Sequence, residues 1–250
     1  MKHFTVLIFG ILLSALAVAD ECTVDLNYNI QVSSEALIVS DETETIYEIR
    51  QGGLLSVKGE SVDLDEEQMA LAEEYAGEVA VLVPQWIALV SSALTVAEQA
   101  LEVAFTALFG ENSAAVSKST EALANARARF EASSSVEDGV YSISVTAFDS
   151  VGGAFDEEFD EEIEDAVMAS LGSVFVEIGK ALMSPEADFG ESMEAFGERM
   201  DVMGEELEAM TEGLEGTAEE LCKGMKKVEK LEKKVMKEIP ELADYQLFGS

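Results

Sequence analysis

Residues 189–235 decide the fold that this sequence predicts: FGESMEA FGERMDV MGEELEA MTEGLEG TAEELCK GMKKVEK LEKKV. Written in sevens, the stretch places apolar residues at alternating spacings of four and three. Such regular heptads are typical of a coiled-coil-like helix. We expect one long helix over 184–239, with Pro185 in its first turn and Pro240 ending it. A break near 213–217, where Gly213 and Gly216 lower helix propensity, is the less favoured alternative.

The first half of this heptad seam is a candidate surface for helix packing or for a partner. It consists of Phe189, Met193, Phe196, Met200, Met203, Leu207 and Met210. Methionines at helical spacing usually pack in a core. A thioether copper site at Met200 and Met203 is therefore a much weaker reading. The covering partner is either the rest of this chain or another protein.

Charge is strongly polarised along the predicted helix. Residues 186–220 are acidic apart from Arg199, whereas 223–237 are rich in lysine. The simpler interpretation is complementation of the helix dipole and of the acidic body. The alternative is a basic surface that meets acidic material of a cell envelope.

Residues 1–19 predict a secretory signal peptide. A short basic start precedes an apolar run, and Ala17-Val18-Ala19 forms a small-residue cleavage site. We expect export and a single mature domain over 20–250. With a formal net charge of −36, nucleic acid is not an expected partner.

The mature sequence predicts an α+β protein that is mainly α. Short runs rich in β-branched residues indicate a strand and hairpin region over 20–64. A helical body follows over 65–183, starting at an Asp65–Gln68 capping box and including a strand at 140–148. We expect a kink or break before Pro84 and a third long helix over 153–183. With the long helix at 184–239, these segments predict a bundle of long helices, and 240–250 is a tail.

The segment 79–97 contains only uncharged residues and approaches the length of a membrane span. Pro84, Gln85 and two serines interrupt it, and no basic residue nearby sets an orientation. Burial within the helical body is therefore favoured over membrane insertion.

Few residues point to catalysis. The only histidine, His3, lies in the signal peptide, and no phosphate-binding loop, zinc spacing or nucleophile elbow is present. We expect no cofactor and no metal site. An enzyme that uses carboxylates is the alternative, although the many acidic residues single out no pair.

Cys22 and Cys222 are the only cysteines. In an oxidising compartment a disulfide between them is favoured over two free thiols. It would fasten the start of the strand region to the middle of the long helix.

Several features in order carry a resemblance to a known family. A signal peptide is followed closely by Cys22, a hairpin at 58–60, the LDEEQ helix start at 64–68, an Asp138-Gly139 turn and Cys222 in the last helix. This order resembles the YggN family of Gram-negative envelope proteins, which has no assigned function. The resemblance implies a periplasmic protein, supports the Cys22–Cys222 pairing and supplies no catalytic residues. We expect a non-enzymatic protein that binds envelope proteins or itself through helices. A membrane-associated component using 79–97 is a further alternative.

Overall fold

The computed structural model describes residues 25–109, 113–147, 165, 167, 168, 170 and 189–249, and within 189–212 it describes only some of the side chains. The chain forms two compact units. Unit 1 comprises 1–90, 131–148 and 215–250, and unit 2 comprises 91–130 and 149–214. Two long helices, α2 (Glu66–Phe109) and α6 (Phe189–Glu238), contribute residues to both units.

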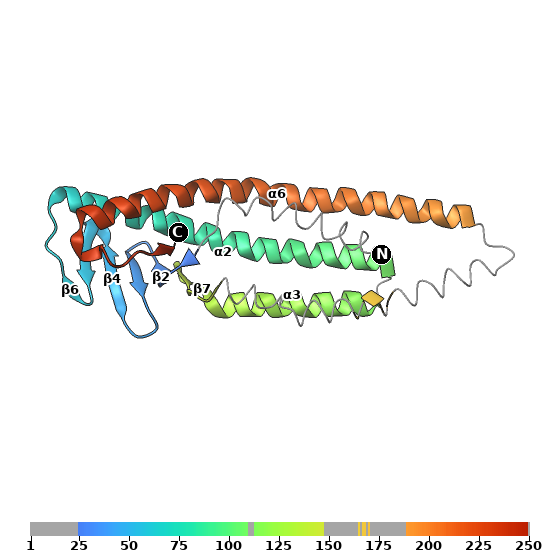
Figure 1. Cartoon of the computed structure of the whole chain (residues 1–250), viewed down its shortest axis with the longest axis horizontal. Coiled ribbons are helices and arrows are strands. Elements are labelled where there is room, and N and C mark those ends of the chain that lie inside the picture. Colours follow the sequence, from blue (N-terminus) through green and yellow to red (C-terminus); the bar gives the residue numbers. More distant parts are fainter. Residues whose placement is uncertain are drawn as a thin grey trace. The chain divides into compact units, whose positions relative to one another are not determined.

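Unit 1 contains a seven-stranded antiparallel sheet (Figure 1). Its strands in chain order are β2 (Asn29–Val32), β3 (Ala36–Ser40), β4 (Thr45–Arg50), β5 (Leu54–Val57), β6 (Glu60–Ser61), β7 (Ser134–Glu137) and β8 (Val140–Ile143). Their order across the sheet is β6-β5-β4-β3-β2-β8-β7, so the hairpin β7–β8 joins the edge of the N-terminal meander.

One face of this sheet is buried because apolar residues meet in register. Ile30 of β2 pairs with Val39 and with Ile143, and Val39 pairs with Tyr47. None of these four side chains exposes more than 2% of its surface. The alternate residues, which point to the other face, are more polar, as in the Gln31–Ser142 pair. The alternation therefore sets which face receives the helices.

Two of the hairpins turn where the sequence predicts turns. Lys58 and Gly59 have positive φ angles of 50° and 80°, and Asp138 and Gly139 have 49° and 80°. Two consecutive residues with positive φ form the primed turns that suit the twist of a hairpin. These two turn predictions are confirmed.

The start of α2 is held by the predicted capping box and lies against the sheet. The Asp65 N–H donates to Gln68 Oε1 at 3.0 Å, and the Gln68 N–H donates to Asp65 Oδ1 at 2.9 Å. One turn further the backbone of Met69 lies against Gly53, with no room for a β-carbon at Gly53. Gly53 ends the 3₁₀ turn η2 (Gln51–Gly53) that connects β4 to β5.

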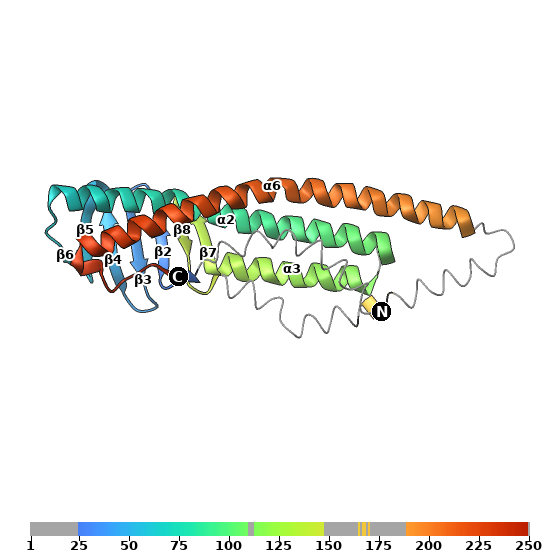
Figure 2. The same ribbon diagram turned by 45° about the horizontal axis from the view of Figure 1, so that its top comes forward.

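Within unit 1 the last third of α6 runs antiparallel to the start of α2 (Figures 1 and 2). Gln68 Nε2 donates to the carbonyl of Glu238, and Lys227 Nζ lies 2.7 Å from Glu78 Oε1. Further along the pair, a β-carbon at Gly224 would meet Leu82 Cδ1 at 3.0 Å. Residue numbers at these contacts increase along α2 while they decrease along α6, so the two helices are antiparallel.

The chain after α6 closes unit 1. A 3₁₀ turn, η3 (Pro240–Leu242), leads to β9 (Phe248–Gly249), which pairs with β1 (Asp25–Leu26) in a separate two-stranded sheet. Leu247 and Phe248 expose 0% and 1% of their surface. The segment predicted as a tail is therefore part of the core.

In unit 2, α3 (Ala114–Ser133) packs beside the second half of α2. Arg127 Nη2 donates to Glu98 Oε2 at 2.8 Å and to Thr95 Oγ1 at 3.2 Å. The Ala115 N–H donates to Ser170 Oγ at 3.4 Å. These hydrogen bonds hold α3 against α2 and against Ser170.

The predicted architecture of a short strand region followed by a bundle of long helices is wrong. The described part of the chain contains a seven-stranded antiparallel sheet and three helices. The strand β7 was missed because its sequence SSVE has almost no apolar residues at its edge position. The strand predicted over 140–148 ends at Ile143, and 144–147 form a turn after it.

The long helices themselves continue where interruptions were considered. α2 is one helix through Pro84, so the chain does not break there, and a kink at this position stays a prediction. α6 is one helix through Gly213 and Gly216, which confirms the favoured continuous form. The predicted signal peptide at 1–19 and most of the predicted helix over 153–183 lie outside the described residues.

Candidate functional site

A buried glutamate in α6 is the centre of the candidate site. Glu232 exposes 3% of its surface, although it stands in the lysine-rich part of the helix. It belongs to the buried stripe of α6, which consists of Leu221, Met225, Val228, Glu232 and Val235 and continues at Ile239 just after the helix. A carboxylate thus occupies a seam position where a coiled-coil pattern would place an apolar residue.

Three groups donate hydrogen bonds to the Glu232 carboxylate. The Tyr75 hydroxyl and the Leu247 N–H lie 3.1 Å and 2.6 Å from Oε1, and the Phe248 N–H lies 3.4 Å from Oε2. The hydroxyl oxygens of Tyr47 and Tyr75 are 3.4 Å apart. The network therefore joins α6, α2, β4 and the segment that leads into β9.

Burial sets the protonation behaviour of these groups. Loss of solvent raises the pKa of the Glu232 carboxyl, and the donors from Leu247, Phe248 and Tyr75 offset part of that rise. Burial also raises the pKa of both tyrosines, so each stays a neutral hydroxyl at physiological pH. The network combines a carboxylate that is costly to ionise with donors that stabilise its ionised form.

This geometry holds chain segments together. Both Glu232 oxygens accept hydrogen bonds from backbone N–H groups that no strand partner satisfies, and buried donors of this kind need an acceptor. Nearby, Asn27 donates its N–H to the Leu247 carbonyl at 2.9 Å and its Nδ2 to the Gln246 carbonyl at 3.0 Å. The C-terminal segment is thus fixed from both sides.

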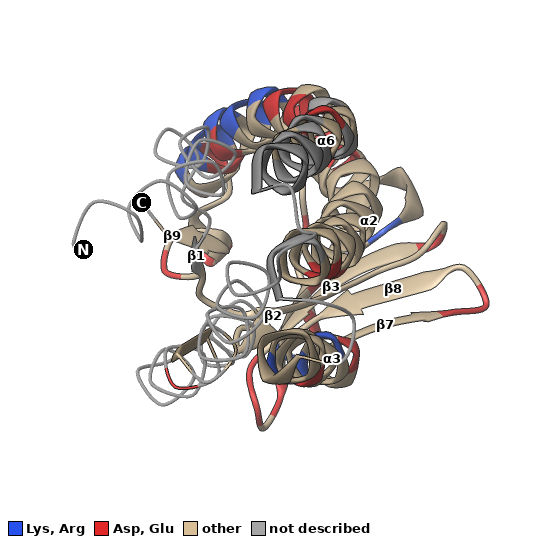
Figure 3. Ribbon diagram, turned by 90° about the vertical axis from the view of Figure 1, so that its right-hand side faces the viewer, with Lys and Arg blue, Asp and Glu red and all other residues tan. Residues whose placement is uncertain are grey.

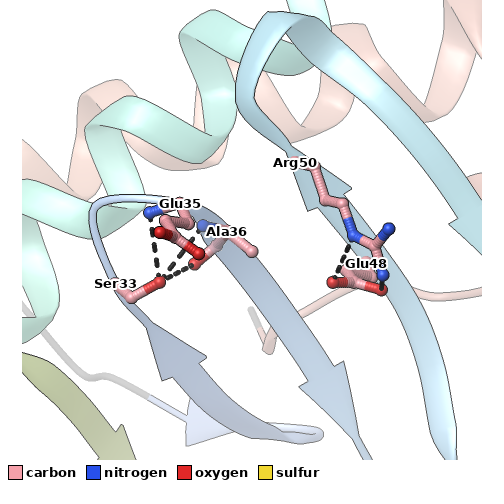
Figure 4. Close-up of polar contacts among 5 residues, drawn as sticks. All are labelled: Ser33, Glu35, Ala36, Glu48 and Arg50. Carbon is pink, nitrogen blue, oxygen red and sulfur yellow. Dashed lines mark hydrogen bonds and ion pairs between the residues drawn. The ribbon is translucent and has the colours of Figure 1, made fainter.

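On the polar face of the sheet, the positive charge of Arg50 is neutralised by Glu48. Arg50 donates through Nε and Nη2 to both carboxylate oxygens of Glu48, at 2.8 Å and 3.0 Å (Figure 4). Beside this pair, the Ser33 hydroxyl accepts from the N–H groups of Glu35 and Ala36 and shapes the β2–β3 turn. Within the described residues, no group of three or more His, Cys, Asp or Glu side chains has a metal-binding arrangement.

The sequence-predicted site residues fall in two groups. The candidate surface Phe189, Met193, Phe196, Met200, Met203, Leu207 and Met210 lies on α6, and the side chains of these seven residues are outside the described part. Cys222 is half-buried on α6, whereas Cys22 lies outside the described residues, so their disulfide stays a prediction.

The apolar segment 79–97 is only partly covered. Val79, Val83 and Trp86 are buried, whereas Val81 exposes 59% of its surface. Among the described residues, α2 is the one helix whose length and composition would allow it to cross a membrane, and 33% of its most apolar window is buried. Core helices of soluble proteins meet the same criterion.

Sequence reasoning missed the buried network. The lysine-rich sequence around Glu232 gave no reason to expect a buried acid. The heptads as written also place Gly224 and Leu231, the first residues of their sevens, on the buried face, but both are only half-buried. The buried position of Glu232 could have been found from the apolar residues Leu221, Met225, Val228, Val235 and Ile239. They follow alternating spacings of four and three, and position 232 fills the one gap in that pattern.

The fold and the network define a small α+β protein whose buried polar groups serve to fasten its C-terminal segment. A family profile described as "Protein of unknown function (DUF2884)" matches residues 22–248, and the chain belongs to this family. No curated protein and no solved structure matches the chain.

Proposed function

We propose that this is an exported, non-enzymatic periplasmic protein of the YggN type that binds envelope proteins or a second copy of itself through its long helices. The signal-peptide pattern at 1–19 supports export. The structural role of Glu232 supports a protein whose polar core serves stability. In this proposal the mature chain starts at residue 20 and acts by association.

The observation that carries the association is the uncovered surface of α6. A β-carbon added at Gly197 or Gly204 would meet no atom of the described residues within 4 Å. Val202, between these glycines, exposes 55% of its surface. A helix that presents small residues to open space allows another helix to approach closely, and exposed apolar residues favour that contact.

In-cell cross-linking followed by purification from the periplasm tests this proposal. We expect a defined partner, or a second copy, cross-linked through α6. Alanine substitutions at Phe189, Phe196 and Met203 should remove this product while the melting temperature changes little. A loss of several degrees with unchanged partners would show that the seam is core. Recovery of the protein only from the cytosol, with residues 1–19 retained, would refute export.

Membrane association through 79–97 is the second candidate. It is favoured by the exposure of Val81 and by the low burial of the apolar window of α2. Alkaline carbonate extraction distinguishes the two candidates. A spanning helix keeps the protein in the membrane pellet, whereas release into the soluble fraction excludes it.

A further inference from the structure

The last third of α6 carries a one-sided lysine surface. It consists of Lys223, Lys226, Lys227, Lys230, Lys233, Lys234 and Lys237. At 3.6 residues per turn these seven positions fall within roughly a third of the helix circumference and extend over about 21 Å. They lie opposite the buried stripe that contains Val228 and Glu232. Figure 3 shows basic residues gathered along this stretch of α6.

Part of this lysine surface forms no ion pair with the acidic residues that the structure describes. Lys227 pairs with Glu78 at 2.7 Å, Lys223 lies 3.6 Å from Glu219, and Lys237 lies 2.9 Å from Glu238. Lys230, Lys233 and Lys234 are exposed and form no ion pair with the described residues. These three ammonium groups, of which Lys234 also lies within electrostatic range of Glu238, are accessible to an acidic partner.

The acidic stretch of the same helix matches the lysine surface in period. Glu205 and Glu219 are exposed and stand in the heptad column that continues with Lys226 and Lys233. Glu208 and Glu215 form a neighbouring exposed column. Acidic and basic residues thus recur at the same spacing of seven positions. When two copies of α6 lie side by side, successive acidic residues of one copy can therefore face successive lysines of the other.

We propose that the lysine surface of α6 in one copy binds the glutamate stretch of α6 in a second, antiparallel copy. This inference rests on the proposed function and names the partner. Parallel copies would place acid against acid and lysine against lysine, which is repulsive. Antiparallel copies bring Lys230 near Glu205, and a two-fold axis repeats the contact at the other end.

Small residues near the centre of the pairing allow the two helices to approach. Gly213 and Gly216 leave open space where a β-carbon would stand, and Ala209 is exposed. Lipid phosphates would satisfy the lysine charge but have no heptad period. The many carboxylates elsewhere on the chain also oppose docking onto an anionic bilayer.

Neutralising the three unpaired lysines tests the proposal. We expect the mature protein to form a dimer in analytical ultracentrifugation, and added salt to weaken it. The triple variant Lys230→Gln, Lys233→Gln, Lys234→Gln should raise the dissociation constant about tenfold, equivalent to about 1.4 kcal/mol. Its control makes the same change of net charge away from α6, through Ala70→Glu, Ala124→Glu and Ala128→Glu at exposed sites. The control should keep the wild-type constant.

A charge swap shows whether the two stretches meet directly. One variant carries Lys230→Glu, Lys233→Glu and Lys234→Glu, and the other carries Glu205→Lys, Glu208→Lys and Glu215→Lys. Each alone should be monomeric, because residues of like charge then face each other across the proposed contact. An equimolar mixture should form a heterodimer, which a fold-disrupting substitution could not produce.

Three outcomes overturn the inference. They are a monomeric wild type, a dimer that the lysine substitutions leave intact, and a monomer that binds anionic phospholipid vesicles through these lysines. Cross-linking to a different envelope protein, together with a monomeric wild type, would leave the proposed function standing while removing the second copy as partner.

Discussion

Gly53 shows how a single side chain is excluded by a close approach between elements. A β-carbon there would stand 1.9 Å from the Met69 carbonyl oxygen, whereas one at Gly52 would meet nothing within 4 Å. Both glycines have positive φ, 76° at Gly52 and 71° at Gly53. A substitution by alanine at Gly52 therefore measures the cost of the backbone conformation alone. The same substitution at Gly53 adds the cost of a steric clash.

We expect Gly53→Ala to lower the free energy of unfolding by about 3 kcal/mol, because α2 must move away from the β4–β5 connection. Gly52→Ala should cost about 1 kcal/mol, the penalty of a left-handed conformation alone. Urea unfolding monitored by circular dichroism measures both. Equal losses in the two variants would contradict the close contact.

Glu232 gives the protein a pH dependence with a defined sign. Its pKa is raised in the folded state, so the folded protein binds this proton more tightly than the unfolded chain does. The contribution to stability is complete below the ordinary value of 4.5 and is lost as pH rises through the raised pKa. Asp41 and Glu238 have lowered pKa values and act in the opposite direction.

Comparison of wild type with Glu232→Gln isolates this contribution. The difference in stability between the two proteins should change as pH rises above 4.5, with the wild type losing stability relative to the variant. Thermal melts over a pH series measure the difference. Glu241→Gln, which removes an exposed carboxylate, serves as the control. A difference that does not vary with pH would show that Glu232 does not titrate in this window.

At the scale of elements, the buried stripe of α6 contains Met225 and Glu232 and continues at Ile239 just after the helix. It does not contain Gly224 and Leu231, which are half-buried. Two methionines on this helix test that placement. Met225 exposes 2% of its surface, and Met236 is half-buried. We expect Met225→Ala to lower the free energy of unfolding by about 3 kcal/mol, and Met236→Ala by less than about 1 kcal/mol. Chemical denaturation of the two variants measures both losses of unfolding free energy. A larger loss for Met236→Ala than for Met225→Ala would contradict the observed buried stripe.

Elements with strong local signals could be predicted from the sequence. The capping box at Asp65 and Gln68, the turns at Gly59 and Gly139, and the continuity of α6 depend on neighbouring residues alone. The architecture could not be predicted, because it depends on the pairing of β2 with β8, more than 100 residues apart. The site could not be predicted either, because the buried hydrogen-bond network of Glu232 forms only when the fold brings Leu247 and Tyr75 to its carboxylate. A heptad pattern reports which face of a helix is buried but not whether a sheet lies beneath it.

At the scale of the whole molecule, the predicted Cys22–Cys222 disulfide would join the segment before β1 to α6. A covalent link across about 200 residues contributes roughly 5 kcal/mol in the chain-entropy model. We expect the oxidised protein to melt well above the Cys22→Ser, Cys222→Ser variant. Peptide mapping without reduction should recover one linked pair. Two alkylated thiols in the protein purified without reductant would exclude the link.

The pairing of β1 with β9 has a consequence for how the protein is made. Asp25 lies opposite Gly249, so the first described strand of the chain cannot pair until nearly all 250 residues have been synthesised. Contacts between such distant positions are slow to form, and a waiting strand edge can pair with a wrong neighbour. We therefore expect the nascent polypeptide to expose the edge of β1 until β9 has been made. A circular permutant that joins residue 249 to residue 25 through a short turn would remove this delay.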